Sequence, residues 1–98
     1  MLTRDEVLRT LDRERASLLG LGVLRLGLFG SFAHDAAHPG SDLDFVVDFQ
    51  PRTFDRYMDL KLLLERLFGR PVDLVLADAV KPRLRPAILG EAVYAQGL

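Results

Sequence analysis

Two aspartates, Asp42 and Asp44, stand two positions apart in the segment DLDFVVDF, which is otherwise apolar except for Asp48. Side chains two apart on a strand point to the same face, so a strand here would bring both carboxylates together. At about 6 Å and an effective dielectric constant of about 20, they would repel by about 3 kcal/mol. A divalent cation such as Mg²⁺, which prefers oxygen ligands, would turn that repulsion into attraction. Judged by spacing alone, a D-x-D pattern more often indicates two solvated acids, or a turn capped here by Asp42, than a metal site.

Gly30 and Ser31 precede this pair, at the end of another apolar segment. Glycine permits close approach to the backbone, and the amides that follow it can point at a phosphate together with the Ser31 hydroxyl. Taken alone, a Gly-Ser pair usually only makes a turn. A phosphate-binding turn followed by a metal-binding acid pair, however, predicts a site for a nucleoside triphosphate and Mg²⁺.

Asp73, in the segment PVDLVL, is a third acid in an apolar context. An unpaired buried carboxylate is costly, so one interpretation is a residue at a frayed edge that bonds to the backbone. If its strand lies beside the strand of Asp42 and Asp44, Asp73 instead joins these two acids. It could then accept a proton from an attacking hydroxyl or share a metal. Asp48 has the same parity as the pair but lies at the far end of its strand, so we expect a surface acid.

The elements that would position these residues alternate between helices and strands. We expect helices at 3–20, 31–38 and 53–69, a short helix within 81–95, and strands at 23–29, 42–49 and 72–76. Thr53 is the expected N-cap of the third helix and Gly69 its C-terminal stop. This order predicts an α/β fold, a mixed sheet of three or more strands with helices packed on it.

The first of these helices has its own signals. Thr3 and Glu6 stand in capping-box spacing, and Gly20 and Gly22 end the helix. Four leucines fall near one face of it: Leu8, Leu11, Leu18 and Leu19. We therefore expect that face to pack on the sheet.

Length and composition limit the class of protein. The 98 residues suit one domain spanning 1–98, and a net charge of −1 gives no global field for nucleic acid, which we do not expect as a direct ligand. The chain has no cysteine, which excludes disulfides and thiolate metal sites and fits a reducing compartment. No apolar run reaches the roughly 20 residues that span a bilayer, and the N-terminus lacks the apolar core of a signal peptide. We expect a complete cytoplasmic domain without a membrane partner.

Gly30-Ser31, ten intervening residues and Asp42-Leu43-Asp44 match the G-S-x10-D-x-D motif of the polymerase-beta-like nucleotidyltransferases. The resemblance covers nearly the whole chain. In particular, LGLFGSFAHDAAHPGSDLDFVVDF, LERLFGRPVDLVL and KPRLRPAILGEAVYA resemble the minimal nucleotidyltransferases (MNT). Members of this group are small single-domain proteins, commonly encoded as antitoxins beside helical HEPN toxins.

This resemblance implies a Mg²⁺-dependent nucleotidyltransferase. Asp42 and Asp44 would bind Mg²⁺ and the triphosphate, Gly30 and Ser31 would hold the β- and γ-phosphates, and Asp73 would be the third acid. The implied reaction moves AMP from ATP to a tyrosine hydroxyl of a cognate HEPN ribonuclease toxin, which would also make the protein part of a hetero-oligomer.

The chain departs from the family pattern just after Gly-Ser. Where the family often has Arg-Gly, this sequence has His34-Asp35, so a permanent cation is replaced and a negative charge added near the phosphates. A catalytically weakened module that neutralises its HEPN partner by contact alone is therefore the alternative. A third candidate is an enzyme acting on a small molecule or an RNA end, although 98 residues leave little room for the extra domain that usually encloses such acceptors.

The remaining candidates have ordinary explanations. His34 and His38 have no evident third ligand and read as exposed loop residues. The basic residues Lys81, Arg83 and Arg85 could touch phosphates, RNA or an acidic partner, or simply form a solvated helix face. Tyr57 and Met58 are expected in the core or at its rim. A second set is expected mainly in the core and could also contact a partner: Ile88, Leu89, Val93 and Tyr94.

Overall fold

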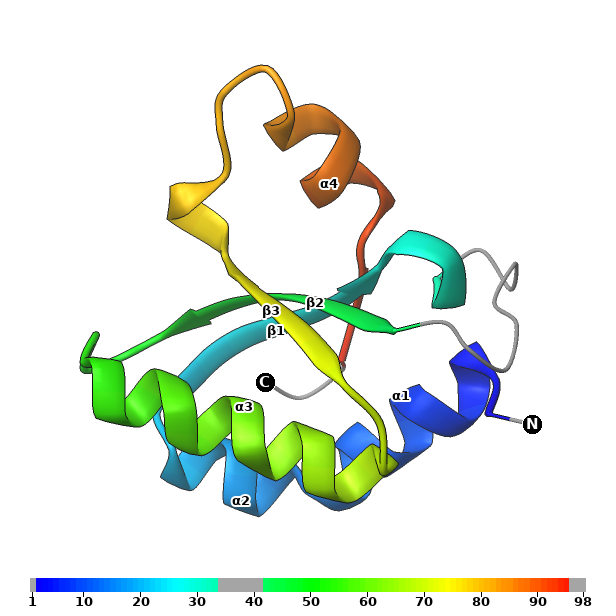
Figure 1. Ribbon diagram of the computed structural model, residues 1–98, viewed down its shortest axis with the longest axis vertical. Coiled ribbons are helices and arrows are strands. Elements are labelled where there is room, and N and C mark those ends of the chain that lie inside the picture. The colour runs from blue at the N-terminus through cyan, green and yellow to red at the C-terminus, as the bar shows by residue number, and fades with distance from the viewer. Residues whose placement is uncertain (1, 34–41, 96–98) are drawn as a thin grey trace.

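The computed structural model describes residues 2–33 and 42–95, which form a four-stranded sheet with helices packed on it (Figure 1). The elements in this part of the chain are α1 (Arg4–Arg13), α2 (Arg15–Gly20), β1 (Val23–Phe29), the 3-10 helix η1 (Gly30–Phe32), β2 (Leu43–Phe49), α3 (Phe54–Phe68), β3 (Val72–Leu76), the 3-10 helix η2 (Ala77–Ala79), α4 (Arg85–Glu91) and β4 (Val93–Tyr94). The expected α/β fold with a mixed sheet is confirmed.

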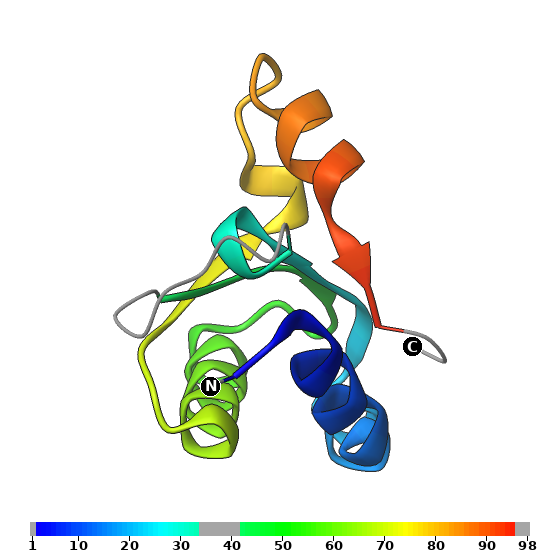
Figure 2. The ribbon, with the colours of Figure 1, turned by 90° about the vertical axis from the view of Figure 1, so that its right-hand side faces the viewer.

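The sheet has the strand order β3-β2-β1-β4. β1 is antiparallel to both β2 and β4, whereas β2 and β3 are parallel. Figures 1 and 2 show α1, α2 and α3 on one face of the sheet, and η2 and α4 on the other. We call the face opposite α1–α3 the open face.

Alternation along β2 decides which side chains reach each face. Leu43, Phe45 and Val47 are almost completely buried, whereas Asp44 and Asp48 are only partly buried. Because successive strand side chains point to opposite faces, the apolar set meets the helices and the acids lie on the open face. The core that holds this arrangement has these members at its centre: Val7, Leu11, Leu18, Leu26, Leu28, Phe45, Val47, Leu60 and Leu64.

The expected single N-terminal helix is two helices, because Glu14 leaves helical geometry at φ −96° and ψ 15°. The Thr3 hydroxyl accepts a hydrogen bond from the Glu6 backbone N–H at 3.2 Å, as the capping-box spacing predicts. Leu18 is completely buried, but Leu19 is 50% exposed, so the expectation that both pack on the sheet was wrong for Leu19. Adjacent residues lie about 100° apart around a helix, so when α2 turns Leu18 into the core, Leu19 points away from it.

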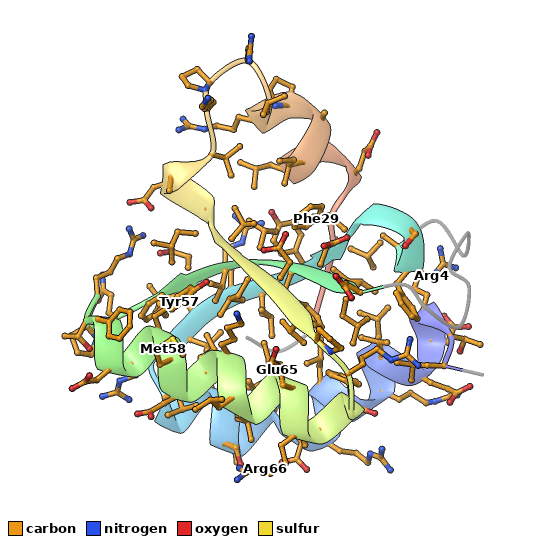
Figure 3. All side chains as sticks on the ribbon, in the orientation of Figure 1. Arg4, Phe29, Tyr57, Met58, Glu65 and Arg66 are labelled. Atoms are coloured by element: carbon orange, nitrogen blue, oxygen red, sulfur yellow. The ribbon has the colours of Figure 1, made fainter. Side chains whose placement is uncertain are left out.

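The helix α3 begins and ends as its sequence predicts. The Thr53 hydroxyl accepts from the Arg56 backbone N–H at 3.1 Å, and Gly69 adopts a left-handed conformation with φ +63°. Tyr57, on the sheet side of this helix (Figure 3), donates from its hydroxyl to the Leu74 carbonyl at 2.7 Å. The bond ties α3 to β3, in keeping with the expected core or rim position of Tyr57.

The C-terminal segment holds the expected short helix, α4, and a strand that the sequence did not predict. β4 pairs with β1 through Val93 and Tyr94 only, too few residues for a periodic pattern. The Tyr94 ring lies over Gly27, where an added Cβ would come within 2.9 Å of a ring carbon, and the Arg25 guanidinium stacks on that ring at 4.3 Å. Gly27 is thus the place where β4 docks.

Within the short helix expected at 31–38, the described residues are 31–33, and the first two of them belong to the 3-10 helix η1. Residues 34–41, with His34, Asp35 and His38, lie outside the described residues. Among the described helices, none is long and apolar enough to cross a membrane.

Candidate active site

The register of the sheet places Asp44 and Asp73 side by side. In the parallel β2–β3 pair, Asp44 is the direct partner of Asp73, and on the other side of β2 it is the partner of Phe29. Partner side chains in neighbouring strands share one face at a strand spacing of about 4.8 Å. The strand of Asp73 therefore lies beside that of Asp44, the condition under which Asp73 joins the pair, and both carboxylates belong to the open face.

Gly30 follows β1 and lies directly against the Asp44 carboxylate. Its φ is +74°, which favours glycine, and a Cβ built there would lie 2.4 Å from Asp44 Oδ2. A side chain at position 30 would therefore occupy the space of the carboxylate. Ser31 comes next in η1, whose turn is closed by a bond from the Ala33 backbone N–H to the Gly30 carbonyl at 3.1 Å.

The electrostatics of Asp44 show how close the three acids are. Burial, then Asp73 and then Asp42, raise the pKa of the Asp44 carboxyl. Asp42 and Asp73 are exposed, so they meet solvent while Asp44 is partly withdrawn from it. We call these three residues the acid cluster. A bound cation would relieve their mutual repulsion.

The acid cluster suits a hard divalent cation in the chemistry of its donors. Across residues 2–33 and 42–95, no group of three or more His, Cys, Asp or Glu side chains is placed to hold a metal ion by itself. Mg²⁺, however, commonly takes one or two carboxylates and completes its shell with water and substrate phosphates. Carboxylates beside a glycine turn that a Cβ would fill are consistent with that kind of site.

Two arginines that the sequence did not single out support the Gly30-Ser31 turn. Arg4, on α1, donates from Nη1 to the Ala33 carbonyl at 3.2 Å, and Figure 3 shows it beside η1. The Arg70 guanidinium lies 5.2 Å from the ring centre of Phe32, a buried residue of η1. Of the two, only Arg70 could have been noticed in the sequence, because it lies between Gly69, the end of a predicted helix, and the strand of Asp73.

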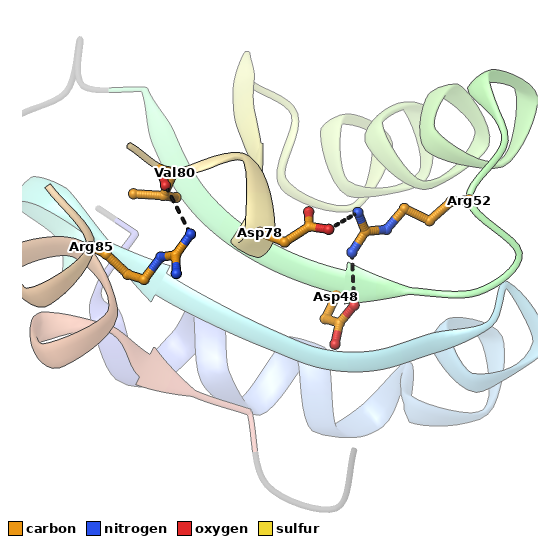
Figure 4. A network of polar contacts seen from close by, with 5 residues as sticks. All are labelled: Asp48, Arg52, Asp78, Val80 and Arg85. Atoms are coloured by element: carbon orange, nitrogen blue, oxygen red, sulfur yellow. Dashed lines mark hydrogen bonds and ion pairs between the residues drawn. The ribbon is translucent and has the colours of Figure 1, made fainter. Parts of the chain in front are cut away.

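A second polar network lies at the other end of β2. Arg52 donates to Asp48 at 3.2 Å and also to Asp78 of η2, which follows β3 (Figure 4). Both hydrogen bonds, the one to Asp78 foremost, raise the pKa of Arg52. Asp48 is thus separate from the acid cluster and has an ion-pair partner, which the sequence did not predict.

The remaining basic candidates lie between η2 and β4. Lys81, Arg83 and Arg85 are exposed, and Arg85 donates from its guanidinium to the Val80 carbonyl at 3.3 Å (Figure 4). A small cavity of about 70 Å³ lies nearby, between the sheet and α4, with Leu89 and Tyr94 in its lining. These two residues and their neighbours Ile88 and Val93 are partly buried.

Comparison with known proteins gives consistent matches. Residues 8–95 match the family model of a nucleotidyltransferase domain. Protein adenylyltransferase MntA of Thermococcus cleftensis is 34% identical over 96 residues, 96% of this chain and 97% of that protein. A solved structure of a protein classed as a minimal nucleotidyltransferase gives a TM-score of 0.82 at 34% identity, covering 94% of this chain and 95% of that one. A crystal structure of a toxin–antitoxin with AMP-PNP gives a TM-score of 0.68 at 19% identity. The match covers 99% of this chain and 75% of that one and shows a shared fold.

Proposed function

The chain belongs to the nucleotidyltransferase domain family, and we propose that it transfers AMP from ATP to a tyrosine hydroxyl of a cognate HEPN ribonuclease toxin. The observation that carries the proposal is the position of Asp44, which pairs with Asp73 and lies against Gly30. The protein substrate is supported by the similarity to MntA, which is named a protein adenylyltransferase and is matched over nearly its whole length. The toxin partner is supported by the fold shared with a toxin–antitoxin structure.

The residues divide into two groups in this proposal. Asp42 and Asp44 would hold Mg²⁺, with Asp73 as the third acid beside them, and the amides after Gly30 together with the Ser31 hydroxyl would hold the β- and γ-phosphates. Bound Mg²⁺ supplies positive charge that neutralises the phosphate oxygens. Because Gly30 brings the phosphate turn against Asp44, the two groups meet at one point on the open face.

The chemistry is an in-line displacement at the α-phosphorus. The tyrosine oxygen forms a bond to that phosphorus, the bond to the β-phosphate oxygen breaks, and pyrophosphate leaves. The acceptor must lose its hydroxyl proton, and Asp73 is placed to take it because it is exposed beside Asp44. An exposed base lets a tyrosine of a second protein approach from solvent.

The experiment incubates the protein and the cognate HEPN toxin with radiolabelled ATP and Mg²⁺. We expect the label on one toxin tyrosine, and we expect Asp42→Asn and Asp44→Asn to abolish the labelling while the fold persists. Asp59→Asn, which changes an exposed acid of α3 outside the acid cluster, is the control and should label normally. Undiminished labelling by the Asp42→Asn, Asp44→Asn double variant would disprove the catalytic assignment.

The same assay separates two roles for Asp73. If it is the base, Asp73→Asn should slow transfer by roughly 10²–10⁴-fold and leave ATP affinity nearly unchanged. If it is mainly a metal ligand, transfer and ATP affinity should fall together. Normal activity in this variant would remove Asp73 from the site.

His34 and Asp35 give a reason to keep one alternative, a module that neutralises the toxin by contact alone. A stable complex in which the toxin carries no AMP, despite ATP and Mg²⁺, would favour it. In either case we propose that the protein acts in the cytoplasm, where ATP is available.

A further inference from the structure

We infer that the segment 80–91, here called the basic arm, docks on an acidic surface of the acceptor protein. The arm carries Lys81, Arg83 and Arg85, all exposed, with the 45% exposed Leu84 among them. This inference rests on the proposed function, since it names the surface that holds the same acceptor. The acid cluster is where the reaction occurs, and the arm is a separate contact.

The arm stands on the reactive side of the molecule. Figures 1 and 2 show it projecting above the open face, on the side away from α1, α2 and α3. Asp44 and Asp73 belong to that same face. A protein that presents a tyrosine to the acid cluster therefore comes up beside the arm.

Both ends of the arm are fixed to the sheet. Just before it, Asp78 of η2 is bonded to Arg52, which also binds Asp48 of β2 (Figure 4). Just after it, β4 pairs with β1, and the Ala95 backbone N–H donates to the Leu26 carbonyl at 2.9 Å. The cations are therefore presented at a set position relative to the acid cluster.

The arm is also internally ordered. The Lys81 carbonyl accepts from the backbone N–H groups of Leu84 and Arg85, at 2.9 and 3.0 Å. Pro82 and Pro86 restrict the backbone on either side of Leu84. A surface held in one shape before binding loses little conformational entropy when a partner docks.

The charges of the arm are available to a partner. Among the described residues, the side chains of Lys81 and Arg83 form no hydrogen bond or ion pair with the rest of the protein. The segment has three basic residues and one acid, in a chain whose net charge is −1. An acidic surface is attracted by the arm and repelled by the acid cluster, so the two fields together orient the acceptor.

The composition of the arm favours a protein over RNA. Exposed Leu84 offers an apolar contact, and residues 80–91 contain no aromatic side chain on which a base could stack. We therefore take the occupant to be an acidic protein surface, that of the HEPN toxin.

The test compares two double variants. The arm variant carries Lys81→Glu and Arg83→Glu, and the control, with an equal change of charge, carries Arg9→Glu and Arg66→Glu. Arg9 and Arg66 are exposed on α1 and α3, and Figure 3 shows Arg66 pointing away from the sheet. AMP transfer is measured against toxin concentration and against ATP concentration. We expect the arm variant to raise KM for the toxin by about 10-fold or more, with KM for ATP and kcat near wild type. The control should behave as wild type, and the wild-type KM for the toxin should rise with salt.

Each other result contradicts the docking inference, the proposed AMP transfer or both. Normal transfer kinetics in the arm variant would mean that the arm does not dock the toxin, while the proposed function stands. An arm-dependent complex without AMP transfer, measured by calorimetry, would keep the docking surface and refute the transfer. If a single-stranded oligo-uridine RNA bound wild type through the arm and the toxin did not, the surface would be one for RNA. Absence of both complex and transfer would refute both proposals.

Discussion

Among single residues, Gly30 and Asp44 set the geometry of the site. The close approach between them exists only because position 30 has no side chain and adopts a positive φ. The partial burial that raises the pKa of Asp44 arises where the chain brings this turn and the neighbouring strands together. The residue that we propose for phosphate binding and the residue that we propose for metal binding are therefore not independent.

Gly30→Ala should weaken nucleotide binding far more than it weakens the fold. A left-handed alanine costs about 1–2 kcal/mol, and here the added Cβ must also displace the Asp44 carboxylate. Gly69→Ala is the matched control, because Gly69 has φ +63° but open space around a Cβ. Urea unfolding and calorimetry with Mg²⁺ and a non-hydrolysable ATP analogue measure both effects. If Gly30→Ala bound the analogue as Gly69→Ala does, the turn would have no part in the phosphate site.

The site could be predicted from the sequence as far as its signals were local. Gly-Ser, D-x-D and an acid inside an apolar strand are visible in short windows, and they identified Gly30, Asp44 and Asp73 as candidates. The pairing of Asp44 with Asp73 and the stacking of Arg70 on Phe32 join residues far apart in the chain. A periodic pattern reports which face a residue takes, but not which strand lies next to it.

Among the elements, those with strong ends were the predictable ones. Thr53 and Gly69 bound α3 because a cap and a left-handed glycine act within a few residues. The break at Glu14 and the two-residue strand β4 have no comparable signal, since tertiary contacts decide both. A glycine inside a strand ordinarily weakens it, but the structure makes Gly27 of β1 the docking point of Tyr94.

Gly27→Ala should release β4 and, with it, the basic arm. Alanine is normally better than glycine in a strand by roughly 0.5–1 kcal/mol, but here its Cβ would come within 2.9 Å of the Tyr94 ring and 3.2 Å of Ala92 Cβ. Gly90→Ala, where nothing lies within 4 Å, is the control and should be neutral or stabilising. Hydrogen exchange of the Ala95 amide, which bonds to Leu26, reports the docking. Unchanged protection at Ala95 in the Gly27 variant would contradict this account.

For the whole molecule, the two faces of the sheet separate stability from function. The core lies between the sheet and α1–α3, whereas the acid cluster and the basic arm lie on the open face (Figures 1 and 2). Three carboxylates held together on that face serve no packing purpose. The raised pKa of Asp44 indicates that its ionised carboxylate costs some stability, which the fold tolerates because the core is elsewhere.

The sign of this effect follows from the raised pKa of Asp44. The folded state holds the Asp44 proton more tightly than the unfolded state does, because burial, Asp73 and Asp42 all disfavour the charged form. Its contribution to stability is therefore greatest in acid and is lost as the pH rises from the ordinary aspartate pKa through the raised one. At neutral pH the ionised carboxylate costs stability, although solvent screening of this half-exposed group keeps the cost small.

Asp44→Asn should consequently be more stable than wild type at pH 7 without ligand, by no more than a few degrees in Tm, and the difference should shrink as the pH falls. Asp59→Asn, which changes an exposed acid of α3, should show no such pH-dependent gain.

Mg²⁺ and an ATP analogue should make wild type more stable than Asp44→Asn. A ligand at 100 times its Kd stabilises the binding-competent protein by about 2.7 kcal/mol, and the Asp44→Asn variant should gain little. Thermal unfolding from pH 4 to pH 7, with and without ligand, measures each step. A free Asn variant less stable than wild type at pH 7 would show that Asp44 stabilises the fold, and equal stabilisation by the ligand would show that Asp44 does not bind it.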